Sequence, residues 1–156
     1  MRQSAGILLY RTSTGAPEFF LVHPGGPFWA GREEGAWTIP KGEFTDEEQP
    51  LAAARREFFE ETGARIEGVF VPLGTVKQKA GKLVHAWACE GDLDAGAISS
   101  NTFRTQWPPR SGKWISVPEI DKAGWFAYNE AARLINAAQR AFLDLLLTHL
   151  QKERNG

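Results

Sequence analysis

The segment from Gly42 to Ala64 constrains the fold of this chain more than any other part of the sequence. It reads GEFTDEEQPLAAARREFFEETGA. Pro50 suits the first turn of a helix, the alanine-rich run after it favours helix, and Gly63 is a helix stop. The segment therefore predicts a loop that leads into a helix over residues 50–62.

This helix has two unlike sides when successive residues are placed about 100° apart. Glu57 lies three residues from Glu60 and four from Glu61, so these carboxylates converge on one side and repel one another. A bound hard cation such as Mg²⁺ would remove that cost, because it prefers carboxylate and water oxygens. A solvated acidic face is the alternative. The opposite side is mostly apolar and consists of Leu51, Phe58, Phe59 and Thr62.

Two further charged residues stand at fixed offsets in the same segment. Glu48 precedes the helix and Arg56 lies within it, eight residues later. An ion pair between them would brace the entry of the loop into the helix. The alternative is an ordinary surface salt bridge, which contributes little stability.

The complete pattern, Gly42-x5-Glu48-x7-Arg56-Glu57-Phe58-x-Glu60-Glu61-x-Gly63-Ala64, resembles the signature box of the Nudix hydrolases. These enzymes cleave diphosphate linkages with magnesium. The resemblance implies a Mg²⁺ cofactor, with Mn²⁺ as the alternative ion. It also implies metal ligands, for which we take Glu57, Glu60 and Glu61. Glu60 is our choice of general base, with Glu48 and Arg56 as supporting catalytic residues; family members place the base differently.

Markers outside the box distinguish the substrate groups of this family, and several are missing here. The chain lacks the downstream proline of ADP-ribose hydrolases and the SQPWPFPQS-like array of the NADH type. The lead-in Trp37-Thr38-Ile39-Pro40-Lys41-Gly42 resembles enzymes that act on dinucleoside polyphosphates or inositol diphosphates. We therefore expect a nucleoside diphosphate linked to another group, either a nucleoside triphosphate or a dinucleoside polyphosphate.

Composition limits the other classes of function. A chain of 156 residues with 42% hydrophobic residues suits one domain over residues 1–156. A net charge of -1 argues against a nucleic acid polymer or an anionic membrane as partner, and leaves a small nucleotide. The single cysteine, Cys89, excludes an internal disulfide and a cysteine-rich zinc site. With no apolar membrane span or signal peptide evident, the cytoplasm is the expected location. The oligomeric state stays open.

The order of expected elements favours an α+β fold, an α/β/α sandwich with a mixed sheet, which is also the Nudix architecture. A second main helix is expected at the C-terminus, where Asn136 and Gln139 resemble a capping pair. Residues 101–113 are expected to be irregular because of Pro108 and Pro109. Strands are expected at 4–10, 18–23, 37–40, 69–78 and 83–90, with a last one at 114–117.

Substrate-binding residues are expected before and after the box. Lys41 can reach a phosphate as a point charge, although an ordinary loop lysine is equally compatible with its position. Aromatic faces stack on bases and arginines bind phosphates, which makes residues 100–113 a candidate substrate loop. The alternative is a structural loop with its aromatic side chains tucked under the domain. The candidates in this loop are Phe103, Trp107 and Arg110. A second set lies in the glycine- and proline-rich loop over residues 23–35, the early loop, and consists of Phe28, Trp29 and Arg32.

Two other functions compete with hydrolysis. A nucleotide-binding module of the same fold would sense a ligand without cleaving it, but such a module need not retain all three glutamates. A diphosphate isomerase would need an altered box and a reactive cysteine, and Cys89 lies in an apolar run without an evident partner. The three histidines show no ligand spacing and receive no role.

Overall fold

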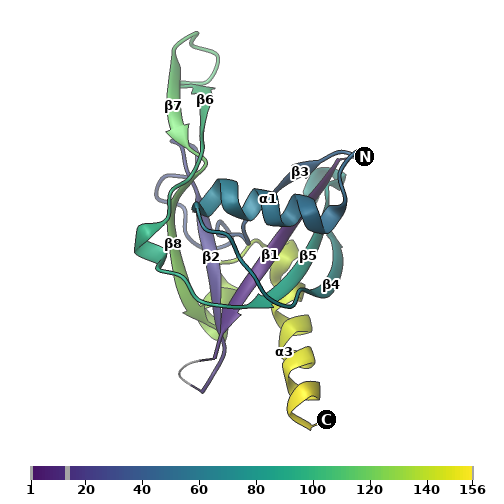
Figure 1. Ribbon diagram of the computed structural model, residues 1–156. Helices are drawn as coiled ribbons and strands as arrows, with labels where there is room; N and C mark the ends of the chain where they lie inside the picture. The colour runs from purple at the N-terminus through teal and green to yellow at the C-terminus, as the bar shows by residue number, and fades with distance from the viewer. Residues whose placement is uncertain (1, 13–14, 156) are drawn as a thin grey trace.

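A six-stranded mixed sheet forms the centre of the molecule (Figure 1). The structure is a computed structural model that describes residues 2–12 and 15–155. Strand order is β4-β5-β1-β2-β8, and β3 pairs with β1 beside β2. Among the described strands of this sheet, β1 and β5 run parallel and the other pairs are antiparallel. The strands of this sheet are β1 (Gln3–Arg11), β2 (Glu18–Pro24), β3 (Lys41–Phe44), β4 (Val71–Lys77), β5 (Leu83–Glu90) and β8 (Ile120–Ala127).

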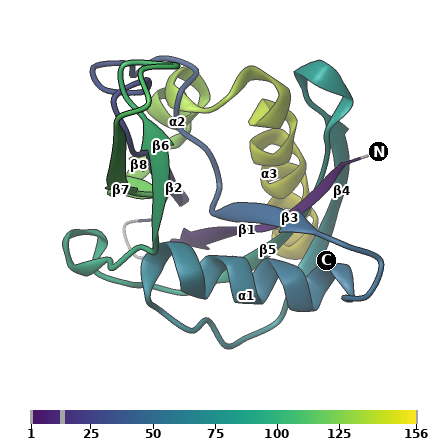
Figure 2. The same cartoon turned by 90° about the horizontal axis from the view of Figure 1, so that it is seen from above.

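Helices cover both faces of the sheet, as Figure 2 shows from above. Helix α1 (Pro50–Thr62) packs on one face, and α2 (Tyr128–Leu134) and α3 (Arg140–Asn155) pack on the other. Side chains of β1 alternate between the two cores: Ile7 and Leu9 point toward α1, and Leu8 points toward α3. This confirms the expected α+β sandwich with a mixed sheet. None of the described helices is long and apolar enough to cross a membrane.

Helix α1 begins and ends where the sequence predicted. Pro50 occupies its first turn, and the backbone N–H of Gly63 donates to the carbonyl of Phe59 at 2.7 Å to close its last turn. Its sides differ from the expected division, however. Glu57 and Glu61 are buried, whereas Phe59 is 38% exposed beneath the guanidinium of Arg65. The helix therefore turns two of its carboxylates inward, against the edge of the sheet.

A second, two-stranded sheet projects from the body at the top of Figure 1. It is the hairpin β6 (Thr102–Gln106) and β7 (Trp114–Pro118). The expectation of an irregular segment over 101–113 was wrong for β6, because Pro108 and Pro109 lie in the connecting turn and leave the strand free to pair. We use the name arm for this hairpin, residues 102–118.

The predicted strand over 114–117 is confirmed as β7, but it is not the last strand. The last strand is β8, which pairs along the whole of β2; the sequence did not indicate it because charged residues and Gly124 interrupt its apolar pattern. The strand predicted over 37–40 was wrong. The strand beside the box begins at Lys41, whereas Trp37 and Thr38 make only isolated bridges. Asn136 does cap the turn that precedes α3, by accepting from the N–H of Ala138 at 3.0 Å. Its expected partner Gln139 instead accepts from the N–H of Ile39 at 3.0 Å.

Candidate functional site

Strand β3 and helix α1 meet where the box begins. A Cβ atom built on Gly42 would overlap the carboxylate of Glu57, so only glycine permits this approach. Glu57 is 8% exposed, and burial followed by repulsion from Glu60 raises the pKa of its carboxyl. The first glycine of the box thus positions a glutamate that lies fifteen residues further along the chain.

Arg56 holds three glutamates of the box. Its Nε and Nη2 atoms donate to both carboxylate oxygens of Glu48, at 2.8 and 2.9 Å. Its Nη1 atom donates to Glu57 at 2.8 Å and to Glu60 at 3.1 and 3.2 Å. The forked pair with Glu48 lowers the pKa of that carboxyl and fixes the loop against α1. The expected brace between Glu48 and Arg56 is present, and it extends to two of the proposed metal ligands.

Glu61 points away from this network, toward Lys41. The backbone N–H of Lys41 donates to Glu61 Oε1 at 3.3 Å. Glu61 is 8% exposed, and burial raises the pKa of its carboxyl to about 8 despite the positive charge of Lys41. Burial also lowers the pKa of the Lys41 ammonium, followed by repulsion from Lys82. A cation in the space that these groups face would stabilise the charged form of Glu61, and an anion there would stabilise the charged form of Lys41.

That space is a cavity of about 310 Å³, and it contains an acidic residue that the sequence did not reveal. Glu119, between β7 and β8, lines it together with Lys41 and Glu61. Burial, followed by repulsion from Glu60, raises the pKa of the Glu119 carboxyl. An acidic residue within the apolar run Val117-Pro118-Glu119-Ile120 was the available signal in the sequence. The remaining lining residues are Pro24, Gly25, Trp29, Thr38, Phe103 and Ile120.

The predicted substrate residues fall in different places. Lys41 is the first residue of β3 and is partly buried, so it is not an ordinary loop lysine. Phe103 lines the cavity with Glu61, and Trp107 lines a neighbouring cleft. Arg110 lies in the turn of the arm with φ 60° and lines neither space. The cavity thus brings together Lys41, Phe103 and Glu61 of the predicted residues, whereas Glu57, Glu60 and Arg110 do not line it.

The chemistry of the acidic residues fits a divalent cation. Glu57, Glu61 and Glu119 all have carboxyl groups whose pKa is raised by burial and by acidic neighbours, which a bound cation would oppose. All the groups are oxygen donors, as Mg²⁺ requires. Among residues 2–12 and 15–155, however, no three His, Cys, Asp or Glu side chains are already arranged around a metal position. Arg56 lies between Glu57 and Glu60 in this arrangement.

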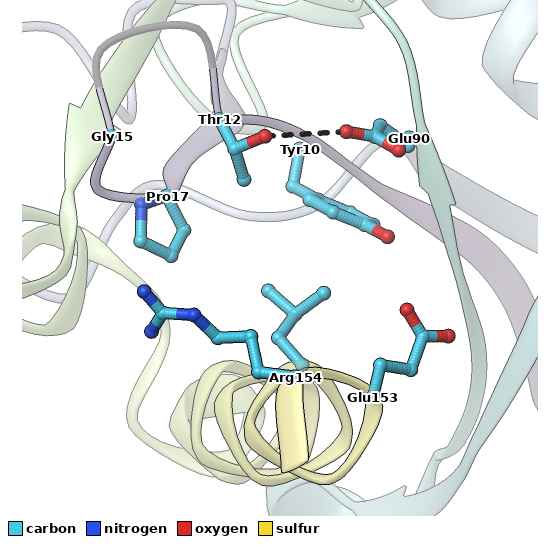
Figure 3. A pocket seen from close by; sticks show the side chains of 8 residues that line it. Tyr10, Thr12, Gly15, Pro17, Glu90, Glu153 and Arg154 are labelled. Carbon is cyan, nitrogen blue, oxygen red and sulfur yellow. Dashed lines mark hydrogen bonds between the residues drawn. The ribbon is translucent and has the colours of Figure 1, made fainter. Parts of the chain in front are cut away.

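A larger cavity of about 440 Å³ lies between the β1–β2 turn and the end of α3 (Figure 3). Its walls carry Glu90 and Glu153, and Arg154 is its only cationic lining residue in the described part of the chain. Burial, then the charge of Glu90, raises the pKa of Tyr10 to about 12 there. An anionic diphosphate would meet repulsion from both carboxylates, and no residue of the box lies nearby. This cavity is therefore not the candidate active site.

The mixed sheet and the box helix together define the class of the Nudix pyrophosphohydrolases. A family model described as NUDIX domain matches residues 1–146, and the chain belongs to this family. No curated protein sequence matched the chain. Among solved structures, a C. elegans Ap4A hydrolase binary complex is similar, with 22% identity, a TM-score of 0.70, and coverage of 96% of this chain and 98% of that one.

Two further solved structures share the fold at lower identity. One is the NUDIX domain of Shewanella oneidensis NrtR complexed with ADP ribose, which is 15% identical with a TM-score of 0.61. The match covers 99% of this chain and 88% of the NrtR chain. The C-terminal domain of mouse MUTYH, in a complex with human PCNA, is 18% identical with a TM-score of 0.61, and covers 97% and 90%. At these identities the similarity establishes the fold.

Proposed function

We propose that this protein hydrolyses a diphosphate linkage in a nucleoside triphosphate or a dinucleoside polyphosphate, with Mg²⁺ as its cofactor. The observation that carries the proposal is the burial of Glu57 and Glu61 beside Lys41, at the edge of a cavity that Glu119 also lines. Glu57, Glu60 and Glu61 would hold the Mg²⁺ ion, whose charge would stabilise the negative charge that develops in the transition state.

The residues of the box have separate roles in this proposal. Glu57, Glu60 and Glu61 are the metal ligands. Arg56 and Glu48 position two of them, because one guanidinium contacts Glu48, Glu57 and Glu60. Lys41 lines the cavity and is the group that would receive a substrate phosphate.

The general base is better assigned to Glu119 than to Glu60. Both oxygens of Glu60 accept from Arg56, which competes for the lone pairs that would take a proton from water. Glu119 faces the cavity, and its raised pKa favours proton acceptance. Glu119→Gln should lower kcat by about 10²-fold or more and remove the acidic limb of the pH profile of kcat. If Glu60→Gln removes that limb and Glu119→Gln does not, the original assignment holds.

The choice of substrate has two supports of unequal weight. The C. elegans protein is named an Ap4A hydrolase, and Ap4A is a dinucleoside polyphosphate. The lead-in to the box, residues 37–42, resembles enzymes of the same substrate class. A small nucleotide is accordingly the proposed partner, and a cytoplasmic location stays a prediction.

A substrate panel tests this proposal. Purified protein would be incubated with nucleoside di- and triphosphates, dinucleoside polyphosphates and nucleotide sugars, and phosphate and nucleotide products would be measured. We expect cleavage of at least one compound with Mg²⁺ and no cleavage after addition of EDTA. Binding of nucleotides without cleavage of any compound would instead support the nucleotide-binding module.

A further inference from the structure

The two aromatic segments that the sequence offered as alternatives face one another across one cleft. Residues 25–29 form one wall, and the arm forms the other with Phe103, Thr105, Gln106, Trp107 and Pro109. The cleft has a volume of about 360 Å³, within the range of roughly 300–1,000 Å³ typical of small-ligand sites. The segments are more than seventy residues apart in sequence, so only the fold brings them together.

This cleft is continuous with the cavity of the glutamates. Gly25, Trp29 and Phe103 line both spaces. A ligand could therefore extend from the aromatic walls to Lys41, Glu61 and Glu119 without leaving the surface. The two ends differ in chemistry, because among the described residues none that line the cleft is charged, whereas Lys41, Glu61 and Glu119 line the cavity.

The walls are fixed to each other and to the box helix. The N–H of Gly25 donates to the carbonyl of Glu119 at 2.8 Å, and a Cβ on Gly25 would overlap the carbonyl oxygen of Pro118. At the base of the arm, the N–H of Asn101 donates to the carbonyl of Glu60 at 3.0 Å. The position of the cleft is thus tied directly to the helix that carries the glutamates.

The early loop is also anchored at its far end. Buried His23 contacts the Asp121 carboxylate through Nδ1 at 2.8 Å and the carbonyl of Arg32 through Nε2 at 2.6 Å. Within the loop, Phe28 packs edge-to-face on Trp29 at 5.0 Å, and the Arg32 guanidinium lies 4.3 Å from the centre of the Phe28 ring. These contacts order the wall before a ligand arrives, which reduces the entropy lost on binding.

The aromatic side chains are nevertheless left in contact with solvent. Phe28 is 56% exposed, Phe103 40% and Trp107 41%. Three exposed aromatic rings around one apolar cleft indicate a binding surface rather than a core. Aromatic faces stack on nucleobases with little dependence on the identity of the base.

We propose that the cleft between residues 25–29 and the arm binds the nucleobase of the substrate, with Trp107 and Phe28 as stacking residues. This deepens the proposed function and rests on it for the placement of the phosphates over Lys41 and the glutamates. The neutral base would then lie in the aromatic cleft, and the anionic phosphates would lie in the cavity beside Lys41. The aromatic residues of the cleft then set recognition, and the glutamates of the box together with Glu119 carry out the hydrolysis.

A binding experiment tests the cleft without turnover. Calorimetric titrations with a nucleoside monophosphate and with ribose 5-phosphate, which lacks the base, would use wild-type protein in Mg²⁺. Trp107→Ala should lower the affinity for the nucleoside monophosphate by about 5- to 150-fold. This corresponds to the loss of one stacked base, at about 1–3 kcal/mol. It should leave the affinity for ribose 5-phosphate unchanged.

The arm offers a matched control. Trp114 pairs with Gln106, has the Arg104 guanidinium over its ring at 5.3 Å, and does not line the cleft. Trp114→Ala should leave both affinities unchanged. If Trp107→Ala impairs folding, Phe28→Ala on the opposite wall provides the same test. Equal affinities of the wild type for the two ligands, or equal effects of Trp107→Ala and Trp114→Ala, would overturn the proposal. Base-dependent binding by a protein that cleaves nothing would contradict the proposed hydrolysis and leave the cleft assignment intact.

Discussion

The box site and the aromatic cleft share one continuous surface but are built in opposite ways. The box site buries Glu57 and Glu61, with their pKa values raised, and the Glu57 carboxylate lies where a Cβ atom on Gly42 would overlap it. The cleft exposes Phe28 and Trp107 on a loop and an arm that extends from the body. Each region is energetically unfavourable without a ligand: the box site holds buried carboxylates close together, and the cleft exposes apolar surface to water. A metal-bound nucleotide would relieve both.

This difference separates catalysis from recognition. Interactions that strengthen in the transition state change kcat, whereas interactions present equally in substrate and transition state change KM. We assign the glutamates to the first group and the aromatic side chains to the second. The predictions below test that separation, in order of decreasing effect.

The largest effect is expected from Glu57→Gln and Glu61→Gln. Each change removes a negative ligand while keeping its size, and should lower kcat by about 10²-fold or more. The proteins should remain folded, because the substitution also removes repulsion between buried carboxylates. Glu67→Gln, at an exposed glutamate that pairs with Arg55, is the control for steady-state kinetics. Near-wild-type turnover by both box variants would mean that these glutamates do not hold the metal.

A smaller effect is expected from Gly42→Ala. The added methyl group would displace the Glu57 carboxylate, and a misplacement of about 1 Å can lower the rate by about 10²-fold. We expect a loss in kcat of about tenfold to 10²-fold with little change in KM. Gly96→Ala, at an exposed turn, serves as the control. If Gly42→Ala has full activity, close contact between β3 and Glu57 is not needed for catalysis.

The smallest effect concerns stability and pH. The Glu61 carboxyl has a folded-state pKa of about 8 against an ordinary value of 4.5, so the folded state binds more protons between these values. Stability of the metal-free protein should therefore fall as pH rises from about 5 to 8, which thermal denaturation would record as a falling Tm. Glu61→Gln should reduce this slope, and Mg²⁺ should raise Tm most at pH 8. Identical slopes for wild type and variant in thermal denaturation would rule out Glu61 as the source.

The same contrast explains how much the sequence revealed. The box is contiguous in sequence, so the helical period alone places Glu57, Glu60 and Glu61 on one side of the helix. The helix also has the predicted bounds. The inward direction of Glu57 was not predictable from that period, because it depends on contact with β3. Glu119 enters the site only through the sheet, far from the box in sequence.

The aromatic residues of the cleft were identified from the sequence, but their relation was not. Phe28 and Trp107 belonged to two competing candidate sets, since nothing local shows that distant loops meet. Strand β7 of the arm was predicted, but β6 was missed because Pro108 and Pro109 indicated irregular structure over 101–113, whereas β6 ends before them. Long-range pairing, here Phe103 with Val117, determines this part of the site.

The separation of catalysis from recognition is tested most directly by the kinetics of a double variant. kcat and KM would be measured with the best substrate for wild type, Glu57→Gln, Trp107→Ala and the combined variant. We predict that kcat falls about 10²-fold or more only where Glu57 is changed, that KM rises only where Trp107 is changed, and that the two effects on kcat/KM multiply in the combined variant. A fall in kcat from Trp107→Ala as large as that from Glu57→Gln would contradict the assignment of the cleft to recognition and of the box to catalysis.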